Sequence, residues 1–231
     1  PAQRYLKPQV GDQVALGYFH NFGENRFEAS VEVYYKWMQN QFDVRDGADI
    51  LINNNVEDAL LAGDAWSYGA EFLVRKNVGK STGWLSYTWA KTQREIDGIN
   101  GGKPYSPRYD RRHDISFVLT HQFNDRITLG VNWVYATGAA VSFPVGKYEI
   151  EGRTLEYYDD LNRNGDRMPA YHRLDASLTI DGKNKKNRRW QGSWNFSIYN
   201  LYNRRNAFSI YFRESESDPN VTEAVQTTLF G

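Results

Sequence analysis

Glu28 and Glu32 are the two carboxylates whose spacing comes nearest to that of an acid-base site. They stand four positions apart in the segment 27–37, FEASVEVYYKW. On a β-strand both side chains lie on one face, but a rise of about 3.3 Å per residue separates them by about 13 Å. Glycosidases hold their two carboxyl groups about 5 to 9.5 Å apart. Because the sequence shows no nucleophile elbow or phosphate-binding glycine loop either, it predicts no enzyme and favours a polar lining for this pair.

Residues 160–165 have the spacing of the first half of a calcium-binding loop. Asp160, Asn162 and Asn164 alternate with other residues and are followed by Gly165, which would allow the sharp turn of such a loop. The twelfth position is Tyr171 instead of the bidentate glutamate that this kind of site needs. The 4 histidines are dispersed and form no HExxH pair. We therefore predict no metal and no cofactor, and interpret 160–165 as an Asn- and Gly-rich turn.

The densest group of charges lies at residues 110–114, at the start of an expected strand. Two interpretations are open: a binding or gating site at the rim of the sheet, or a network of ion pairs that fixes the connecting loop. We favour the ion-pair network, because charge-dense strand ends are ordinary surface chemistry. The cluster consists of Asp110, Arg111, Arg112, His113 and Asp114.

The composition excludes several classes of protein. Lysine and arginine number 28, as do aspartate and glutamate, so the formal net charge is zero. Nucleic-acid binding depends on clustered excess positive charge, and the basic run at 182–189, GKNKKNRR, is interpreted as a solvated turn. The absence of cysteine excludes a disulfide framework and thiolate metal sites. No apolar run approaches about 18 residues, so no transmembrane helix is expected.

Side chains alternate without a break between apolar and polar from Phe27 to Trp37. Successive side chains of a β-strand point to opposite faces of its sheet, so this pattern predicts a strand. About 10 residues is also the length of a tilted membrane-spanning strand. One helical turn is expected at 56–62. Further strands are expected at 12–22, 66–78, 84–93, 112–123, 127–137, 172–181 and 190–213, the last with a kink, and another begins at 228–231.

The connections between the expected strands alternate in length. Short connections are expected at 23–26, 79–83, 124–126 and 182–189, and long ones at 38–65, 94–111, 138–171 and 214–227. Outer-membrane barrels place tight turns on the periplasmic side and long loops outside. A soluble β-sandwich permits the same alternation of side chains along its strands, and it stays open as the alternative fold.

The two faces of most expected strands differ in polarity. The Phe, Val, Tyr and Trp side of 27–37 carries no formal charge, as lipid contact requires, because Arg or Lys at the bilayer midplane costs about 2–4 kcal/mol. Tryptophan and tyrosine gather toward strand ends, where the aromatic girdles of a barrel lie. The polar faces are expected to line a lumen, with Glu28, Glu32, Lys36, Glu71, Arg75, Asn132, Arg173, Asp175 and Asn195 as its wall.

Several short segments resemble signatures in the C-terminal barrel of TonB-dependent outer-membrane receptors, particularly the branch common in Bacteroidetes. They are SYTWAK at 86–91, YDRRHD at 109–114, YHRLD at 171–175, and SIYNLYNRRN at 197–206 running into AFSIYF at 207–212. The resemblance implies a barrel of about 22 strands, closed by an N-terminal plug and energised through TonB.

On this resemblance, residues 1–231 are expected to form part of one barrel domain. They would be a C-terminal segment of about nine strands, without the plug or the TonB-binding region. TLFG at 228–231 resembles the beginning of the family's last strand, so the end of that strand is expected to be missing as well. An open sheet leaves two unpaired edges, which lipid cannot satisfy, so this segment requires the rest of its barrel.

The resemblance implies import of a scarce, bulky nutrient across the bacterial outer membrane. The partners would be outer-membrane lipid, the remaining barrel and plug, TonB, and a surface lipoprotein, with no nucleic acid. Two other functions stay open. One is a structural or assembly role in which the barrel holds surface lipoproteins. The other is a soluble β-sandwich carbohydrate-binding module, with Trp37, Trp66 and Tyr68 as a stacking platform for a sugar.

Overall fold

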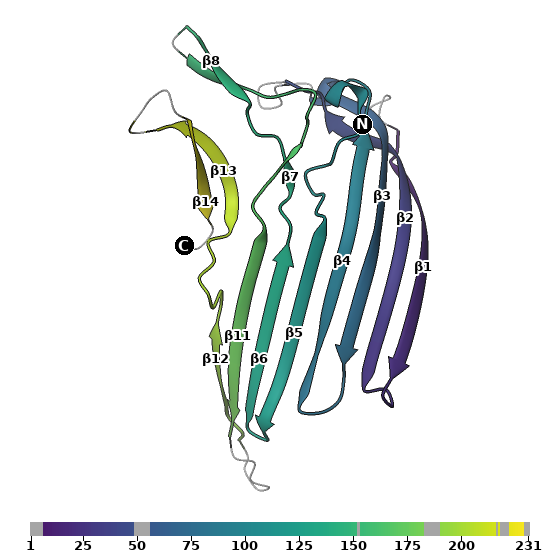
Figure 1. Cartoon of the computed structure of the whole chain (residues 1–231), viewed down its shortest axis with the longest axis vertical. Coiled ribbons are helices and arrows are strands. Elements are labelled where there is room, and N and C mark those ends of the chain that lie inside the picture. The colour runs from purple at the N-terminus through teal and green to yellow at the C-terminus, as the bar shows by residue number, and fades with distance from the viewer. Residues whose placement is uncertain are drawn as a thin grey trace.

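The structure is a computed structural model that describes residues 7–48, 56–151, 153–182, 190–215, 217 and 222–228. Its main element is one sheet of eight strands in the order β1-β2-β3-β4-β5-β6-β11-β12. All neighbouring strands in it are antiparallel, and Figure 1 shows them side by side as one wall. The structure confirms the all-β, up-and-down architecture as an open section of a barrel.

The main sheet is built from long strands. They are β1 (Val10–Phe22), β2 (Phe27–Val44), β3 (Leu60–Lys76), β4 (Ser81–Glu95), β5 (His113–Asn124), β6 (Ile127–Ala136), β11 (Tyr171–Asp181) and β12 (Ser193–Ile198).

Short elements decorate the connections. The 3-10 turn η1 (Val56–Ala59) lies within the predicted helical turn, and a second, η2, spans Asn100–Gly102. Three small two-stranded sheets pair β7 (Ala140–Val141) with β10 (Asp166–Arg167), β8 (Gly146–Ile150) with β9 (Arg153–Tyr157), and β13 (Ala207–Glu214) with β14 (Thr222–Thr228).

Three strands run further than the sequence predicts. β2 continues to Val44, β3 begins at Leu60 and β4 ends at Glu95, so part of the expected 38–65 loop belongs to the sheet. The alternation of apolar and polar residues fades in these extensions, and without it a strand has little sequence signal. A strand that stands beyond the apolar band of a barrel has no lipid to face, so its two faces no longer need to differ.

The predicted kinked strand at 190–213 is wrong. β12 ends at Ile198, β13 begins at Ala207, and the two strands belong to different sheets. The segment between them turns, with Asn200 and Asn203 at φ 54° and 52°. Asparagine tolerates this left-handed region better than most residues, which explains why the polar residues here break the strand instead of kinking it.

The predicted long loop at 214–227 is wrong as well. Most of its second half is strand β14, Thr222–Thr228, which pairs with β13. Residues 229–231 of the expected last strand lie outside the described residues, as do residues 183–189 of the basic turn.

The register of the sheet separates two faces. Glu28 pairs with Arg75, and Arg75 pairs with Trp84. The same row of cross-strand pairs continues over the neighbouring strands to Asn132 and Asp175, so all these residues lie on one face. We call this the polar face. The opposite face, here the apolar face, carries most of the large hydrophobic side chains, and they are exposed, for example Leu16 at 76% and Trp194 at 72%. In soluble proteins such an extended exposed apolar surface is rare.

Several charges depart from the expected pattern of the apolar face, among them Asp12, which pairs with Trp37, and Lys76, which pairs with Phe27. Lys91 pairs directly with Tyr68 on that face. Lys91 stands four residues before the end of β4 at Glu95. A lysine at this level can bury its methylene stem and extend its ammonium group to the interface.

The buried hydrophobic cluster lies among the long connections instead of between two sheets. Ile96, Ile99 and Tyr105 are its buried members, and Leu61 packs against them. A sandwich would bury the apolar faces of its strands against one another, whereas here these faces are exposed. The observed burial therefore contradicts the soluble β-sandwich.

The connections at the two ends of the sheet differ as predicted. The hairpins β1–β2, β3–β4 and β5–β6 close at the lower end of Figure 1, and the longer connections gather at the upper end. Among the described residues, no helix is both long and apolar enough to cross a bilayer.

Candidate functional site

The polar face brings together all nine residues that the sequence assigns to the wall of a lumen. Cross-strand partners join them: Glu28 with Arg75 and Glu32 with Glu71 across β2 and β3, and Asn132 with Asp175 across β6 and β11. The register places Lys36, Arg173 and Asn195 on the same face, because side chains two positions apart in a strand point to the same side. Whether this face lines a lumen stays a prediction, since the structure describes only one section of wall.

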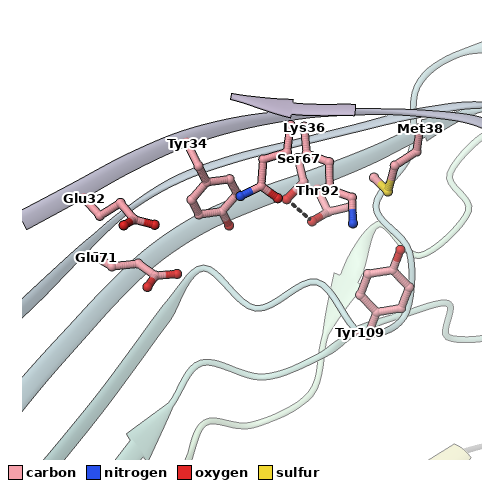
Figure 2. A pocket seen from close by; sticks show the side chains of 9 residues that line it. Glu32, Tyr34, Lys36, Met38, Ser67, Glu71, Thr92 and Tyr109 are labelled. Carbon is pink, nitrogen blue, oxygen red and sulfur yellow. Dashed lines mark hydrogen bonds between the residues drawn. The ribbon is translucent and has the colours of Figure 1, made fainter. Parts of the chain in front are cut away.

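A cavity of about 360 Å³ opens on the polar face over the middle of β2 and β3 (Figure 2). Sequence reasoning identified only part of its lining. The parity of the strands could have added the other strand residues, but not Tyr109, which comes from a long connection and returns to the face only in the folded chain. The cavity is lined by Gln13, Glu32, Tyr34, Lys36, Met38, Ser67, Glu71, Thr92 and Tyr109.

Glu32 and Glu71 lie directly opposite each other in this cavity, and Figure 2 shows their carboxylates side by side. Neither carboxylate forms an ion pair with any residue that the structure describes. Like charges directly opposite in a sheet are destabilising. The pair therefore presents uncompensated negative charge to whatever lies over the polar face.

The next acidic residue along β2 is paired. Arg75 Nη1 lies 3.7 Å from Glu28 Oε2, and both side chains are more than a third exposed, at 44% and 35%. An exposed pair of this kind contributes little energy. It does neutralise the charge of this row, whereas the carboxylates of Glu32 and Glu71 have no cationic partner among the described residues.

Arg173 and Asp175 neutralise each other on β11. Arg173 Nε lies 3.0 Å from both carboxylate oxygens of Asp175, and Nη2 lies 2.9 Å from Oδ2. The guanidinium also stacks on the ring of Tyr199, 4.1 Å from its centroid, and Nη1 donates to the hydroxyls of Tyr171 and Tyr199. These contacts with neighbouring side chains neutralise the charge of Arg173 and fix the position of its guanidinium group.

Side chains of residues 199–206 fix the turn after β12 against β11. Asp175 Oδ1 accepts a 2.9 Å hydrogen bond from the backbone N–H of Asn200. Asn206 receives the N–H of His172 at its Oδ1 and donates from Nδ2 to the carbonyl of His172, at 3.1 and 3.0 Å. The Asn206 amide thus takes the place of β12, which pairs with β11 only from Ala176 onward. The segments 171–175 and 197–206, noted separately in the sequence, form one structural unit.

The charged cluster at 110–114 does not act as one site. Asp110 is buried, and its Oδ2 lies 2.5 Å from Arg167 Nη2 and 3.6 Å from Arg112 Nη2. Its Oδ1 accepts the backbone N–H of Thr92 at 2.7 Å. Asp110 therefore ties the start of β5 to β4 and to β10. Arg167 is the partner that the sequence did not reveal, because it stands 57 positions away.

The other members of the cluster point elsewhere. Arg111 is exposed. His113 Nδ1 lies 2.8 Å from the hydroxyl of Tyr87, and the two rings stack. Both residues lie on the apolar face. Asp114 pairs with Thr88 on the polar face.

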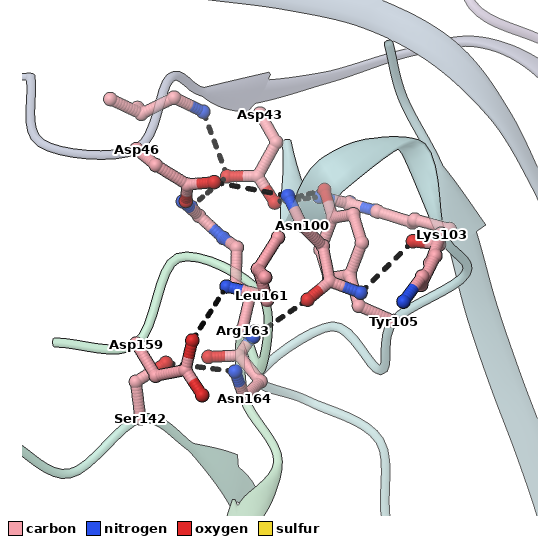
Figure 3. A network of polar contacts seen from close by, with 12 residues as sticks. Asp43, Asp46, Asn100, Lys103, Tyr105, Ser142, Asp159, Leu161, Arg163 and Asn164 are labelled. Atoms are coloured by element: carbon pink, nitrogen blue, oxygen red, sulfur yellow. Dashed lines mark hydrogen bonds and ion pairs between the residues drawn. The ribbon is translucent and has the colours of Figure 1, made fainter. Parts of the chain in front are cut away.

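Polar residues of three long connections form a second network, shown in Figure 3, which we call the loop cap. Asp43 Oδ1 lies 2.9 Å from Arg163 Nη2, and Asp43 Oδ2 accepts from Tyr105 Oη at 2.8 Å and from Arg94 Nη1 at 3.3 Å. Asp46 Oδ1 lies 2.5 Å from Arg163 Nη1. These contacts join β2, β4 and the connection after β9.

The loop cap shifts the titration of its members. Burial, and then the hydrogen bond to the negative Asp43, raises the pKa of Tyr105 well above its usual value. For Arg163, burial lowers the pKa, but the hydrogen bond to Asp46 and the charges of Asp43 and Asp46 outweigh it, so the pKa is raised. Both residues keep their neutral pH protonation states over a wide range.

The calcium-like segment contributes to the packing of the loops. The backbone N–H of Asn164 donates to Ser142 Oγ and its Nδ2 donates to the carbonyl of Ser106, both at 2.8 Å. The backbone N–H of Leu161 donates to Asp159 Oδ1 at 2.9 Å. Within the described ranges, no group of three or more His, Asp and Glu side chains is placed to hold a metal ion.

Known proteins were compared with the chain at the level of sequence and of structure. The family model described as "TonB dependent receptor-like, beta-barrel" matches residues 1–201. Curated protein sequences gave no match.

Two solved structures share the fold. The ferripyoverdine receptor of the outer membrane of Pseudomonas aeruginosa aligns with a TM-score of 0.60 and 14% identity, over 89% of this chain and 25% of that chain. The FrpB iron transporter from Neisseria meningitidis aligns with a TM-score of 0.55 and 14% identity, over 87% and 28%. The chain thus spans about a quarter of the length of these proteins.

The family assignment agrees with the geometry of the sheet. An antiparallel wall with one apolar exposed face, long loops at one end and tight turns at the other is the architecture of an outer-membrane barrel. The neighbours are named as a receptor and a transporter. The chain belongs to the TonB-dependent receptor-like β-barrel family and forms a section of barrel wall in the bacterial outer membrane.

Proposed function

We propose that this chain is part of the wall of a plugged outer-membrane transporter that imports a scarce, bulky nutrient. The observation that carries the proposal is the separation of the two faces across the main sheet. All nine predicted wall residues share the polar face, and the large exposed apolar side chains gather on the other. In a barrel the second face meets lipid, so the polar face lines the interior.

The remaining barrel and a plug complete the transporter in this proposal. Both outer strands of the main sheet, β1 and β12, have a neighbour on one side only within the described residues. Unpaired backbone groups are costly in lipid, so other strands of the barrel continue the wall. TonB acts on the plug, which lies over the polar face. The proposal assigns no catalytic role to any residue of this chain.

The cavity at Glu32 and Glu71 is the position in the wall with the clearest chemical preference. Two opposed carboxylates without a paired cation favour a positively charged group, from the plug or from the passing cargo. The identity of the cargo is set by the plug and the loops, so the proposal names only its class. A role as an assembly partner for surface lipoproteins receives no support from the comparisons.

Thiol accessibility in cells tests the lumen. The chain contains no cysteine, so single cysteines can be introduced at Ser67, on the polar face, and at Val33, on the apolar face. In the full-length receptor, Ser67→Cys is expected to react with a water-soluble maleimide that enters the barrel, whereas Val33→Cys is expected to stay unreactive in lipid. Reaction at Val33→Cys but not at Ser67→Cys would overturn the assignment of the faces.

Energised import has a separate readout in the same variant. Labelling of Ser67→Cys is expected to be faster in cells with TonB than in cells without it, because movement of the plug exposes the lumen. Equal rates in both strains would contradict energised import and leave the face assignment standing.

A further inference from the structure

A hollow opens on the apolar face, beside the turn that follows β12. It has a volume of about 570 Å³ and is lined by Ile115, Trp133, Tyr135, His172 and Tyr202. Ile115, Tyr135 and His172 are direct cross-strand neighbours on β5, β6 and β11, so they form the floor of the hollow. Because these residues lie on the face that meets lipid, the hollow opens toward the membrane and not toward the lumen.

One side of the hollow is formed by a residue that lies outside the sheet. Tyr202 belongs to the turn at 199–206, and its hydroxyl lies 2.7 Å from His172 Nδ1, with the ring centroids 5.5 Å apart. The turn is anchored by Leu201, whose N–H donates to the carbonyl of Leu174 at 2.6 Å, and by the Asn206 amide on His172. These bonds preform the hollow, so an occupant does not have to order it.

Two positive charges follow directly. Arg204 and Arg205 stand two and three positions after Tyr202, and both are exposed. Neither guanidinium has an ion pair or a hydrogen bond with a described residue. By contrast, Arg75 and Arg173 on the polar face of the sheet each form an ion pair with a carboxylate. Two arginines without an ion pair among the described residues, two and three positions after a residue that lines an apolar hollow, complement a ligand that is apolar at one end and anionic at the other.

We propose that this hollow binds an anionic, phosphate-bearing lipid of the surrounding membrane. One acyl chain lies between Trp133, Tyr135 and Tyr202, where apolar area leaves water, and the phosphate meets Arg204 and Arg205. Arginine binds phosphate through charge-assisted hydrogen bonds, and its long side chain can extend toward the head-group level. The inference needs only the placement of the barrel in the outer membrane, and it does not depend on the proposed import.

Native mass spectrometry of the full-length receptor in detergent tests the head-group half of the site. The probes are phosphatidylglycerol and phosphatidylcholine with identical acyl chains. The receptor is expected to retain phosphatidylglycerol more strongly, and the double variant R204Q/R205Q to lose roughly tenfold or more in affinity for it, since each arginine near an anionic head group contributes about fivefold. Affinity for phosphatidylcholine should change little.

A matched control separates this site from general charge attraction. Arg108 and Arg111 are also exposed, but they lie in the connection before β5 and do not line the hollow. The double variant R108Q/R111Q is expected to bind phosphatidylglycerol as the wild type does. If both double variants lose the lipid equally, or if R204Q/R205Q keeps it fully, the proposal is wrong.

A filled hollow tests the acyl-chain half. Ile115→Trp places a larger apolar ring on the floor and keeps the residue suited to lipid, so the barrel is expected to fold, which the usual heat-modifiable gel shift checks. The variant should bind phosphatidylglycerol several-fold more weakly than the wild type. Unchanged affinity would place the lipid elsewhere and overturn the site, as would a bound protein or a second receptor copy that protects this face in place of lipid.

Discussion

The Arg163 guanidinium lies 2.9 Å from the Asp43 carboxylate, although the two residues are 120 positions apart in the sequence. The same carboxylate accepts the hydroxyl of Tyr105. One aspartate at the upper end of β2 therefore joins two long connections that would otherwise be held only by their own strand ends. The loop cap is a structural consequence of β2, β3 and β4 extending beyond the apolar band, because these extensions carry Asp43 to the height of the loops.

Arg163→Met is expected to loosen the loop cap. It leaves Asp43 and Asp46 without their shared cation, and both carboxylates are largely buried, at 18% and 17% exposure. Partly buried groups that lose a charged partner cost about 1–3 kcal/mol. Hydrogen exchange of the connection at 94–111 should become faster while the strands stay protected.

The matched control for Arg163 is Arg26→Met. Arg26 pairs with Glu24 at 3.8 Å in a tight turn, and both side chains are exposed. An exposed pair is worth little, so exchange should not change anywhere. Unchanged exchange in Arg163→Met as well would show that the cap does not fix the loops.

The loop cap is expected to weaken in alkali because of Tyr105, which lies outside the membrane-spanning part of the strands. Its pKa is raised in the folded state above the usual value for tyrosine, by burial and by the hydrogen bond to Asp43. A group with a raised folded pKa contributes stability that is fully present below the unfolded pKa and is lost as pH rises toward the folded pKa. The cap should therefore be unaffected up to about pH 9 and loosen above about pH 10.

Tyr105→Phe provides the comparison for this alkaline effect. The variant lacks the hydroxyl bonded to Asp43, so the cap should be weaker by about 1 kcal/mol at neutral pH. Its hydrogen exchange should then depend less on pH between 9 and 12 than that of the wild type. Identical alkaline profiles in the two proteins would rule out Tyr105 as the titrating group.

Glu71→Gln is expected to have opposite effects with and without a plug. In a receptor engineered to lack the plug, removing one of two opposed carboxylates should stabilise the barrel by about 0.2–1 kcal/mol. In the complete receptor, loss of a carboxylate that binds a positive group of the plug should destabilise it. Thermal unfolding followed by gel shift measures both. Stabilisation in both forms would argue that no cation of the plug sits on Glu32 and Glu71.

Asn206→Ala is expected to destabilise the wall near β11. The variant leaves the N–H and carbonyl of His172 without their partner. An unsatisfied backbone group beside lipid costs about 1–3 kcal/mol, so urea unfolding should shift to lower concentration. Asn21→Ala, in the exposed end of β1, serves as the control and should leave the midpoint unchanged. Equal midpoints for both variants would refute the role of the Asn206 amide.

The sequence predicts the wall better than its ends. Period-two alternation, as in 27–37, depends on a sheet with two different surroundings, lipid and an aqueous interior, and it locates each strand within the apolar band. The extensions of β2 and β4 were missed because they leave that band. The break after Ile198 was missed because an apolar strand pattern resumes at Ala207, and local pattern does not show that the two segments join different sheets.

By itself, the sequence determined the strands, their parity and therefore the set of polar side chains on one face, because these follow from local geometry. Only the tertiary structure decided which of those charges remain open. Asp175 is used by Arg173 and Asn200, and Asp110 by Arg167, while Glu32 and Glu71 face each other. Pairing across strands and between loops depends on register and chain return over long sequence distances, which residue types and spacing do not encode locally.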